Sequence, residues 1–148
     1  MEIHIKTKIN KARVARLATV DQECKPHVIP VVFVLDNDHN CYFIPIDEKT
    51  KRARPENLKR VKNIQENPNV ALLIDEYNED WTKLYFIMIR GKASIVGGRK
   101  LEQNEMSLLR KAHCLLYHKY NQYQTTGVGK YVIMMIPQKV TTWNNESL

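Results

Sequence analysis

Cysteine and glycine are scarce in this chain, which has 3 Cys and 5 Gly among 148 residues. Cys24, Cys41 and Cys114 stand far apart, and no C-x-x-C pair or His/Cys cluster occurs, so neither a zinc site nor a disulfide framework is expected. His113 and His118 fall in one expected helix, but a spacing of five does not place them on one face, and no metal site is predicted. The glycines form no G-x-G-x-x-G, GKS or GKT motif, which excludes the Rossmann and P-loop classes.

Long hydrophobic runs are absent as well. The longest, residues 28–35, has the length of a strand and contains Pro30, so no membrane-spanning helix and no membrane partner are expected. The first residues, MEIHIK, lack the basic and then apolar layout of a secretory signal, which favours a cytoplasmic protein. A length of 148 residues with 43% hydrophobic side chains suits one globular domain over residues 1–148.

What the chain has in excess is positive charge. The 23 Lys and Arg outnumber the 16 Asp and Glu, which gives a formal net charge of +7. This balance implies an anionic partner: a nucleic acid, an acidic surface or a phosphorylated small molecule.

Hydrophobic patterning predicts a mainly β chain. Alternating and β-branched segments predict six strands at residues 16–21, 26–35, 41–44, 70–74, 81–96 and 130–136, the last running toward Trp143. The segment 81–96 is long enough for one bent strand or a strand with a bulge, with the break at Gly91. Helices are expected at residues 6–14, from Pro55 to Pro68 and over residues 100–120, with a loop at 124–129. Because hairpin-length connections dominate, we expect a closed or partly closed antiparallel barrel.

The basic residues gather between positions 47 and 62. Seven of them lie there: Lys49, Lys51, Arg52, Arg54, Lys59, Arg60 and Lys62. Four precede Pro55, at the N-terminal end of the expected helix, where cations oppose the helix dipole. An anion held by backbone N–H groups and by two or three Lys or Arg side chains would reverse this effect. The segment therefore predicts a phosphate site, and a solvated charged loop is the equally open alternative.

An ordered set of short segments resembles a known family. The segments are residues 12–21 (ARVARLATVD), 26–33 (PHVIPVVF), 49–52 (KTKR), 61–68 (VKNIQENP) and 75–81 (DEYNEDW), followed by Arg90 and Gly91. Together they resemble the pyridoxamine 5′-phosphate oxidase-like, flavin-binding split-barrel superfamily. Within it they are most similar to the branch of small FMN- or deazaflavin-dependent oxidoreductases, over roughly residues 9 to 143.

The resemblance implies a six-stranded antiparallel split β-barrel with flanking helices. It also implies a homodimer with FMN or deazaflavin (coenzyme F-420) bound at the subunit interface. The implied cofactor contacts are Pro30, Val31 and Val32 along the ring, Phe43, Ile44 and Pro45 beside the ring and ribityl chain, Lys49, Lys51, Arg52, Lys59 and Lys62 at the phosphate, and Trp81 and Trp143 closing the site, Trp143 from the other subunit.

Some residues depart from the family pattern or have a simpler interpretation. Cys24 stands where relatives usually have Gly in the first hairpin. The C-terminal segment at residues 140–145 offers only Trp143 of the substrate-binding pattern of authentic pyridoxamine phosphate oxidases, which argues against oxidation of vitamin B6. Trp81 is interpreted as a packing residue at least as readily as a cofactor contact. Pro30 is also typical of a strand edge. Tyr120 and Tyr123 are interpreted as core and helix-end residues.

The leading hypothesis is an oxidoreductase that transfers a hydride between a bound flavin or deazaflavin and a small organic substrate. Because the cofactor carries this chemistry, no catalytic side chain is predicted. One alternative is a cofactor carrier or haem-handling protein without turnover. The other is a basic nucleic-acid-binding module, which is disfavoured because no aromatic residues interleave with the basic run and no motif for binding RNA or DNA is recognisable.

Overall fold

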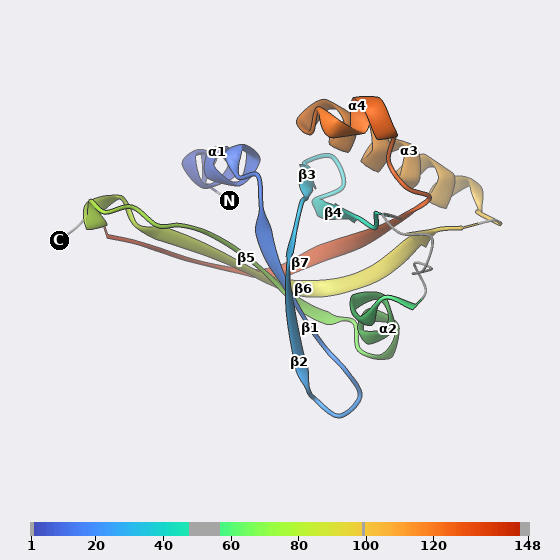
Figure 1. Cartoon of the computed structure of the whole chain (residues 1–148), viewed down its shortest axis with the longest axis horizontal. Coiled ribbons are helices and arrows are strands. Elements are labelled where there is room, and N and C mark those ends of the chain that lie inside the picture. Colours follow the sequence, from blue (N-terminus) through green and yellow to red (C-terminus); the bar gives the residue numbers. More distant parts are fainter. Residues whose placement is uncertain (1, 48–56, 99, 146–148) are drawn as a thin grey trace.

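The computed structural model describes residues 2–47, 57–98 and 100–145, and Figure 1 shows their arrangement. The predictions made for residues 48–56 therefore fall outside the described residues. In chain order the elements are α1 (Ile3–Lys11), β1 (Ala15–Val20), β2 (Pro26–Val31), β3 (Val34–Asp36), β4 (Cys41–Pro45), α2 (Lys59–Glu66), β5 (Asn69–Glu76), the 3-10 turn η2 (Trp81–Lys83), β6 (Tyr85–Gly97), α3 (Gln103–Lys119), α4 (Gln122–Thr126) and β7 (Tyr131–Asn144).

The described strands form one antiparallel sheet in the order β2-β1-β5-β6-β7-β4-β3. This confirms the prediction of a mainly β, antiparallel fold with flanking helices. The predicted number of six strands is wrong, because the sheet has seven. The expected strand at residues 26–35 is two strands, β2 and β3, separated by Val32 and Phe33.

The break between β2 and β3 has a topological cause. β2 pairs with β1, and β3 pairs with β4, so the two halves lie at opposite ends of the hydrogen-bonded order. A chain that passes from one edge to the other through only Val32 and Phe33 must bring the two edges close together. The arrangement is consistent with a split barrel, and we call the Val32–Phe33 crossing the seam.

Tyr120, the residue after α3, holds the seam. Its hydroxyl accepts a hydrogen bond from the Phe33 N–H at 3.1 Å and lies 2.9 Å from the Phe33 carbonyl and 3.0 Å from the Arg13 carbonyl, to either of which it can donate. Phe33 is fully buried and Tyr120 is 8% exposed. The hydroxyl thus replaces the ladder bonds that Phe33 gives up by leaving both strands.

The core lies on both sides of the curved sheet. Inside it, Leu17, Ile44, Leu72 and Ile89 are fully buried and pack with residues of α1 and α2. A second cluster packs α3 against the other side of the sheet. The alternating burial of β1 and β6 confirms the period of two expected for strands with one face in the core.

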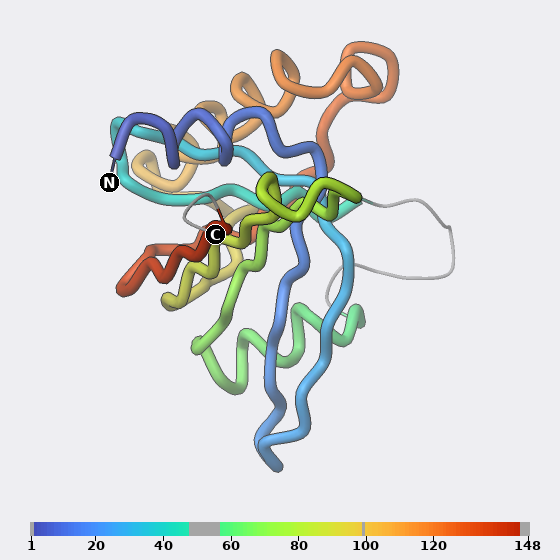
Figure 2. Tube along the Cα trace, turned by 90° about the vertical axis from the view of Figure 1, so that its left-hand side faces the viewer, coloured from blue at the N-terminus to red at the C-terminus, as the bar shows by residue number. Residues whose placement is uncertain are grey.

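Helix α2 lies beside the β1–β2 hairpin (Figures 1 and 2). It buries Val61, Asn63 and Ile64 and leaves Gln65 exposed. Asn63 is tolerated there because its amide donates to the Thr19 hydroxyl at 3.0 Å. The helix begins at Lys59, later than the predicted start at Pro55.

The strands β5 and β6, the turn η2 and the C-terminal half of β7 extend away from the body as an arm (Figure 1). The register between β6 and β7 shifts between Arg90 and Gly91, which confirms the break predicted at Gly91. A Cβ atom at Gly91 would lie 2.1 Å from the Ile136 carbonyl oxygen, so the close approach of β6 and β7 there requires glycine.

The remaining helices differ from expectation mainly at their ends. α1 begins and ends three residues before the predicted 6–14, and α3 begins three residues after the predicted start at Lys100. The expected loop at 124–129 overlaps α4, which ends at Thr126 and is followed by Gly127 with φ +70°. In the part of the chain that the structure describes, no helix is both long enough and apolar enough to cross a membrane.

Candidate functional site

A cavity opens beside the seam and brings together residues from four parts of the chain. Its volume is about 270 Å³, and we call it the seam cavity. The lining residues are Val14, Pro30, Val31, Val32, Pro45, Asp47 and Arg60. Of the predicted ring contacts, Pro30, Val31, Val32 and Pro45 thus meet at one place. They meet because β2 ends at the seam, and β4 pairs with β3, the strand that begins just after the seam.

Arg60 supplies the cationic group of the seam cavity. Its Nε atom is buried and has no hydrogen-bond partner among the described residues. Burial lowers the pKa of Arg60, and the nearby Asp47 carboxylate opposes that shift. Because arginine stays charged at neutral pH, the buried N–H is an unused donor that an anionic or carbonyl-bearing ligand would satisfy.

Arg60 was counted in the basic run but was not among the predicted phosphate contacts. It follows Lys59 and precedes Val61, the first buried residue of α2. A position at the edge of the buried face is where a long basic side chain can pass from the core to a cavity. That position is the signal in the sequence that would have singled it out.

The other predicted ring contacts, Phe43 and Ile44, lie elsewhere. Both are fully buried. Ile44 belongs to the main core, and Phe43 belongs to the cluster under α3. Their side chains therefore support the strand that leads to Pro45, and neither lines the seam cavity.

The predicted phosphate contacts are divided by the structure. Lys49, Lys51 and Arg52 lie outside the described residues. The exposed Lys59 ammonium lies 3.5 Å from an Asp21 carboxylate oxygen, toward the β1–β2 hairpin. Lys62 is exposed on α2, and neither it nor Lys59 lines the seam cavity.

The two tryptophans lie at the tip of the arm, on the far side of the molecule from α4 (Figure 1). Trp81 is 62% exposed, and its indole N–H lies 3.4 Å from the Tyr77 hydroxyl. Trp143 is 45% exposed and stacks on Phe86 with ring centroids 6.1 Å apart. Neither tryptophan lines a cavity at the seam of its own subunit.

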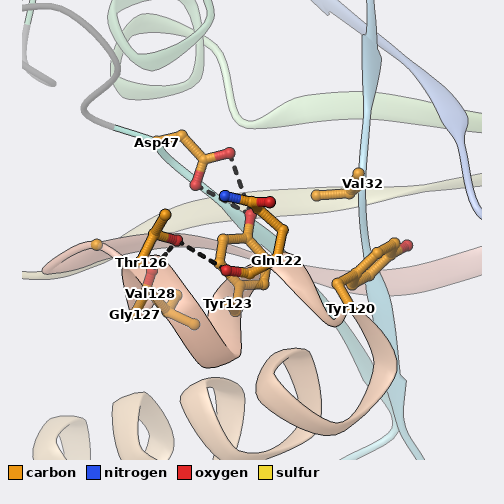
Figure 3. Close-up of a pocket in the computed structure, with 9 residues that line it drawn as sticks. Val32, Asp47, Tyr120, Gln122, Tyr123, Thr126, Gly127 and Val128 are labelled. Atoms are coloured by element: carbon orange, nitrogen blue, oxygen red, sulfur yellow. Dashed lines mark hydrogen bonds between the residues drawn. The ribbon is translucent and has the colours of Figure 1, made fainter.

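A second and larger pocket adjoins the seam cavity (Figure 3). Its volume is about 460 Å³, and we call it the α4 pocket. The lining residues are Val32, Asp47, Tyr120, Gln122, Tyr123, Thr126, Gly127, Val128 and Gly129. Val32 and Asp47 line both cavities, so the two are neighbours, and we call them together the groove.

Tyr123 and Asp47 join α4 to the end of β4. The Tyr123 hydroxyl donates to the Asp47 carboxylate, whose oxygens lie 2.9 and 3.1 Å away. Burial raises the pKa of Tyr123, and the Asp47 charge and hydrogen bond add to that effect. The interpretation of Tyr120 and Tyr123 as core residues is incomplete, since both are largely buried but also face this pocket.

No cluster of three or more His, Cys, Asp or Glu side chains with metal-binding geometry occurs among residues 2–47, 57–98 and 100–145. The three cysteines are free thiols, and burial raises the pKa of Cys41 to about 12. The groove therefore offers apolar walls, one arginine, one carboxylate and phenolic side chains, and its described residues resemble a site for an organic ligand.

Comparison with known proteins identifies the family. The family model of pyridoxamine 5′-phosphate oxidase matches residues 1–144. The chain belongs to the pyridoxamine 5′-phosphate oxidase-like family. This confirms the resemblance found in the sequence segments, and the similar structures are split-barrel proteins of that kind. No curated protein matches the chain in sequence.

Solved structures share the fold at low sequence identity. The conserved hypothetical protein Rv2991 from Mycobacterium tuberculosis has a TM-score of 0.70 and 18% identity, with 98% of this chain and 85% of that chain covered. HutZ, a haem-storage protein from Vibrio cholerae, has a TM-score of 0.68 and 18% identity, with 97% and 93% covered. A FAD-binding protein from Mesorhizobium loti has a TM-score of 0.65 and 15% identity, with 96% and 94% covered.

Proposed function

We propose that this protein binds a phosphorylated flavin or deazaflavin, FMN or coenzyme F-420, and transfers a hydride between that cofactor and a small organic substrate. The family includes flavin-binding proteins, and one structural neighbour is described as FAD-binding. The bound ring would supply the hydride chemistry, and the protein would bind it, orient it and exclude water.

The observation that carries the proposal is the seam cavity. Pro30, Val31, Val32 and Pro45 supply an apolar wall, and the buried Arg60 Nε points to a ligand that can accept a hydrogen bond. A flat ring with carbonyl oxygens and an anionic tail meets both requirements, because apolar walls bury the ring while the arginine pairs with its polar groups. In this arrangement Arg60 contacts the anionic tail of the cofactor.

The proposal includes a homodimer. Trp81, Tyr77 and Trp143 expose large aromatic surfaces at the tip of the arm, and in their own subunit they lie on the opposite side from α4 (Figure 1). Exposed aromatic clusters of this kind mark protein interfaces. The arm of one subunit would then cover the groove of its partner, and the site would be complete only in the dimer.

Cofactor or haem binding without turnover is the second candidate, because HutZ is described as a haem-storage protein. The groove favours flavin over haem. Among the described residues that line the seam cavity and the α4 pocket there is no histidine, and imidazole is the commonest ligand that proteins offer to haem iron. The nucleic-acid hypothesis rests on the net charge of +7 alone.

Titration of the purified protein with FMN, coenzyme F-420 and riboflavin tests the proposal. We expect FMN or coenzyme F-420 to bind with micromolar or better affinity. The change in ligand fluorescence on binding measures this affinity. The Arg60→Met substitution should lower the affinity for FMN by about 10- to 100-fold. This loss is equivalent to one charge-assisted contact of roughly 1.5–3 kcal/mol. Riboflavin, which lacks the phosphate, should be little affected.

Arg110→Met is the matched control. Arg110 is exposed on α3, and the same substitution there should change neither affinity. If no flavin or deazaflavin binds, the proposed function is wrong. If Arg60→Met lowers the affinities for FMN and for riboflavin equally, Arg60 supports the fold and does not contact the phosphate. Bound cofactor that no electron donor reduces would favour the carrier without turnover.

A further inference from the structure

The α4 pocket differs from the seam cavity in its charge. None of its nine lining residues is Lys, Arg or His, although the whole chain carries a net charge of +7. Its one ionisable acidic side chain is Asp47. The seam cavity contains Arg60 on the other side of the same carboxylate. The groove thus has a cationic part and an anionic part.

The polar rim of the α4 pocket keeps a free acceptor at Asp47, beside the Gln122 side-chain amide. Tyr123 directs its hydroxyl proton to Asp47, and Thr126 directs its own to the carbonyls of Gln122 and Gly127, 3.2 and 3.1 Å away. The Tyr120 hydroxyl is committed to the seam. A carboxylate has about four lone-pair sites, so Asp47 keeps acceptor capacity after bonding to Tyr123.

The walls suit an aromatic ring. The rings of Tyr120 and Tyr123 meet edge to face, with centroids 6.2 Å apart, and Val32 and Val128 complete the apolar lining. Figure 3 shows Tyr120 and Val32 at one end of the pocket and Asp47 with Gln122 and Thr126 at the other. A volume of about 460 Å³ lies in the range of small-molecule sites.

We propose that the α4 pocket binds a small aromatic amine, with the ring against Tyr120 and the ammonium group at Asp47. Its role as the site of the organic substrate rests on the proposed function, because the pocket shares Val32 and Asp47 with the seam cavity that would hold the cofactor ring. The binding itself does not depend on the cofactor. Carboxylates and phosphates are disfavoured, since their charge would face the Asp47 carboxylate with no Lys, Arg or His in the lining to pair with.

Three probes with one ring and different end groups test the pocket: tyramine, tyrosol and 4-hydroxyphenylacetate, titrated calorimetrically into the cofactor-free full-length protein. We expect tyramine to bind at least tenfold more tightly than 4-hydroxyphenylacetate, with tyrosol between them. Asp47→Asn should lower the tyramine affinity about tenfold or more, to the level of tyrosol, because it removes the charge and keeps the shape. The exposed Glu23→Gln, in the turn of the β1–β2 hairpin and in neither cavity lining, is the control and should change nothing.

Tyr123→Phe separates recognition from packing. It keeps the ring and frees the Asp47 oxygens, so tyramine should bind within about threefold of the unmodified protein. Equal or tighter binding of 4-hydroxyphenylacetate, no binding of tyramine, or a loss in Tyr123→Phe as large as in Asp47→Asn would overturn the proposal. The FMN titration keeps the two proposals apart: FMN binding without tyramine binding refutes only the amine site, and tyramine binding without FMN binding refutes only the proposed function.

Discussion

The hydroxyl of Tyr120 is the group whose removal should affect both the fold and the groove. Tyr120→Phe keeps the ring and deletes one oxygen atom. The Phe33 N–H, 3.1 Å from that oxygen, then loses its acceptor, and the carbonyls of Arg13 and Phe33 lose the donor that they share. Phe33 is fully buried, so water cannot replace the lost partner without opening the seam.

The size of the effect follows from the burial. A buried donor left without a partner costs about 1–3 kcal/mol, and we expect Tyr120→Phe to lower the free energy of unfolding by about 2 kcal/mol. Urea denaturation, followed by far-ultraviolet circular dichroism at several protein concentrations, measures it. Because Val32 lines both cavities and precedes Phe33 in the seam, the same variant should also bind FMN more weakly.

Tyr117→Phe is the matched control, one turn earlier on α3. Tyr117 is 44% exposed, and its ring meets His118 edge to face. Loss of its hydroxyl should change the free energy of unfolding by less than about 0.5 kcal/mol. If Tyr120→Phe is as mild as Tyr117→Phe, the hydroxyl does not hold the seam and the argument from the broken strand fails.

Two further substitutions test the charge and the backbone of the fold. The Lys119 ammonium lies 3.9 Å from the Phe33 ring centroid with no hydrogen-bond partner among the described residues, and burial together with Arg13 lowers the pKa of Lys119 to about 8. Below pH 8 Lys119 is charged in both the folded and the unfolded protein, and burial of that charge lowers the free energy of unfolding. As the pH rises from about 8 toward 10.5, the pKa of lysine in the unfolded chain, the folded protein loses this proton first and its stability increases. Lys119→Met should unfold at higher urea concentration than the unmodified protein at pH 7, with the difference narrowing by pH 10; a difference that grows with pH would contradict this assignment. Gly91→Ala places a Cβ 2.1 Å from the Ile136 carbonyl oxygen and should destabilise the protein by at least about 2 kcal/mol; an unchanged thermal midpoint would mean that the bulge relaxes freely.

The strands and the bulge were predictable because their causes are local. Alternating side chains specify a strand wherever one face is buried, and Gly91 stands where the long strand must bend. The seam was not predictable in this way. Residues 26–35 read as one β-branched strand, and the break at Val32 and Phe33 exists because each half has a different neighbour.

Part of the candidate site was likewise predictable from the sequence, and part of it was not. The family resemblance predicted Pro30, Val31, Val32 and Pro45 beside one cofactor ring, and the structure brings these four residues to the lining of one cavity. Arg60 and Tyr123 were not chosen, because a side chain at a helix edge or helix end can face either core or groove. Only packing against other elements decides between the two.

The amino-acid sequence by itself determined the family, the antiparallel β architecture and the positive charge of the chain, because these depend on residue order and periodicity. The tertiary structure alone decided where the barrel is joined and what its groove offers. Tyr120 meets Phe33 across 87 residues, and Tyr123 meets Asp47 across 76. Contacts between residues so far apart depend on how the whole sheet closes, and no local pattern encodes them.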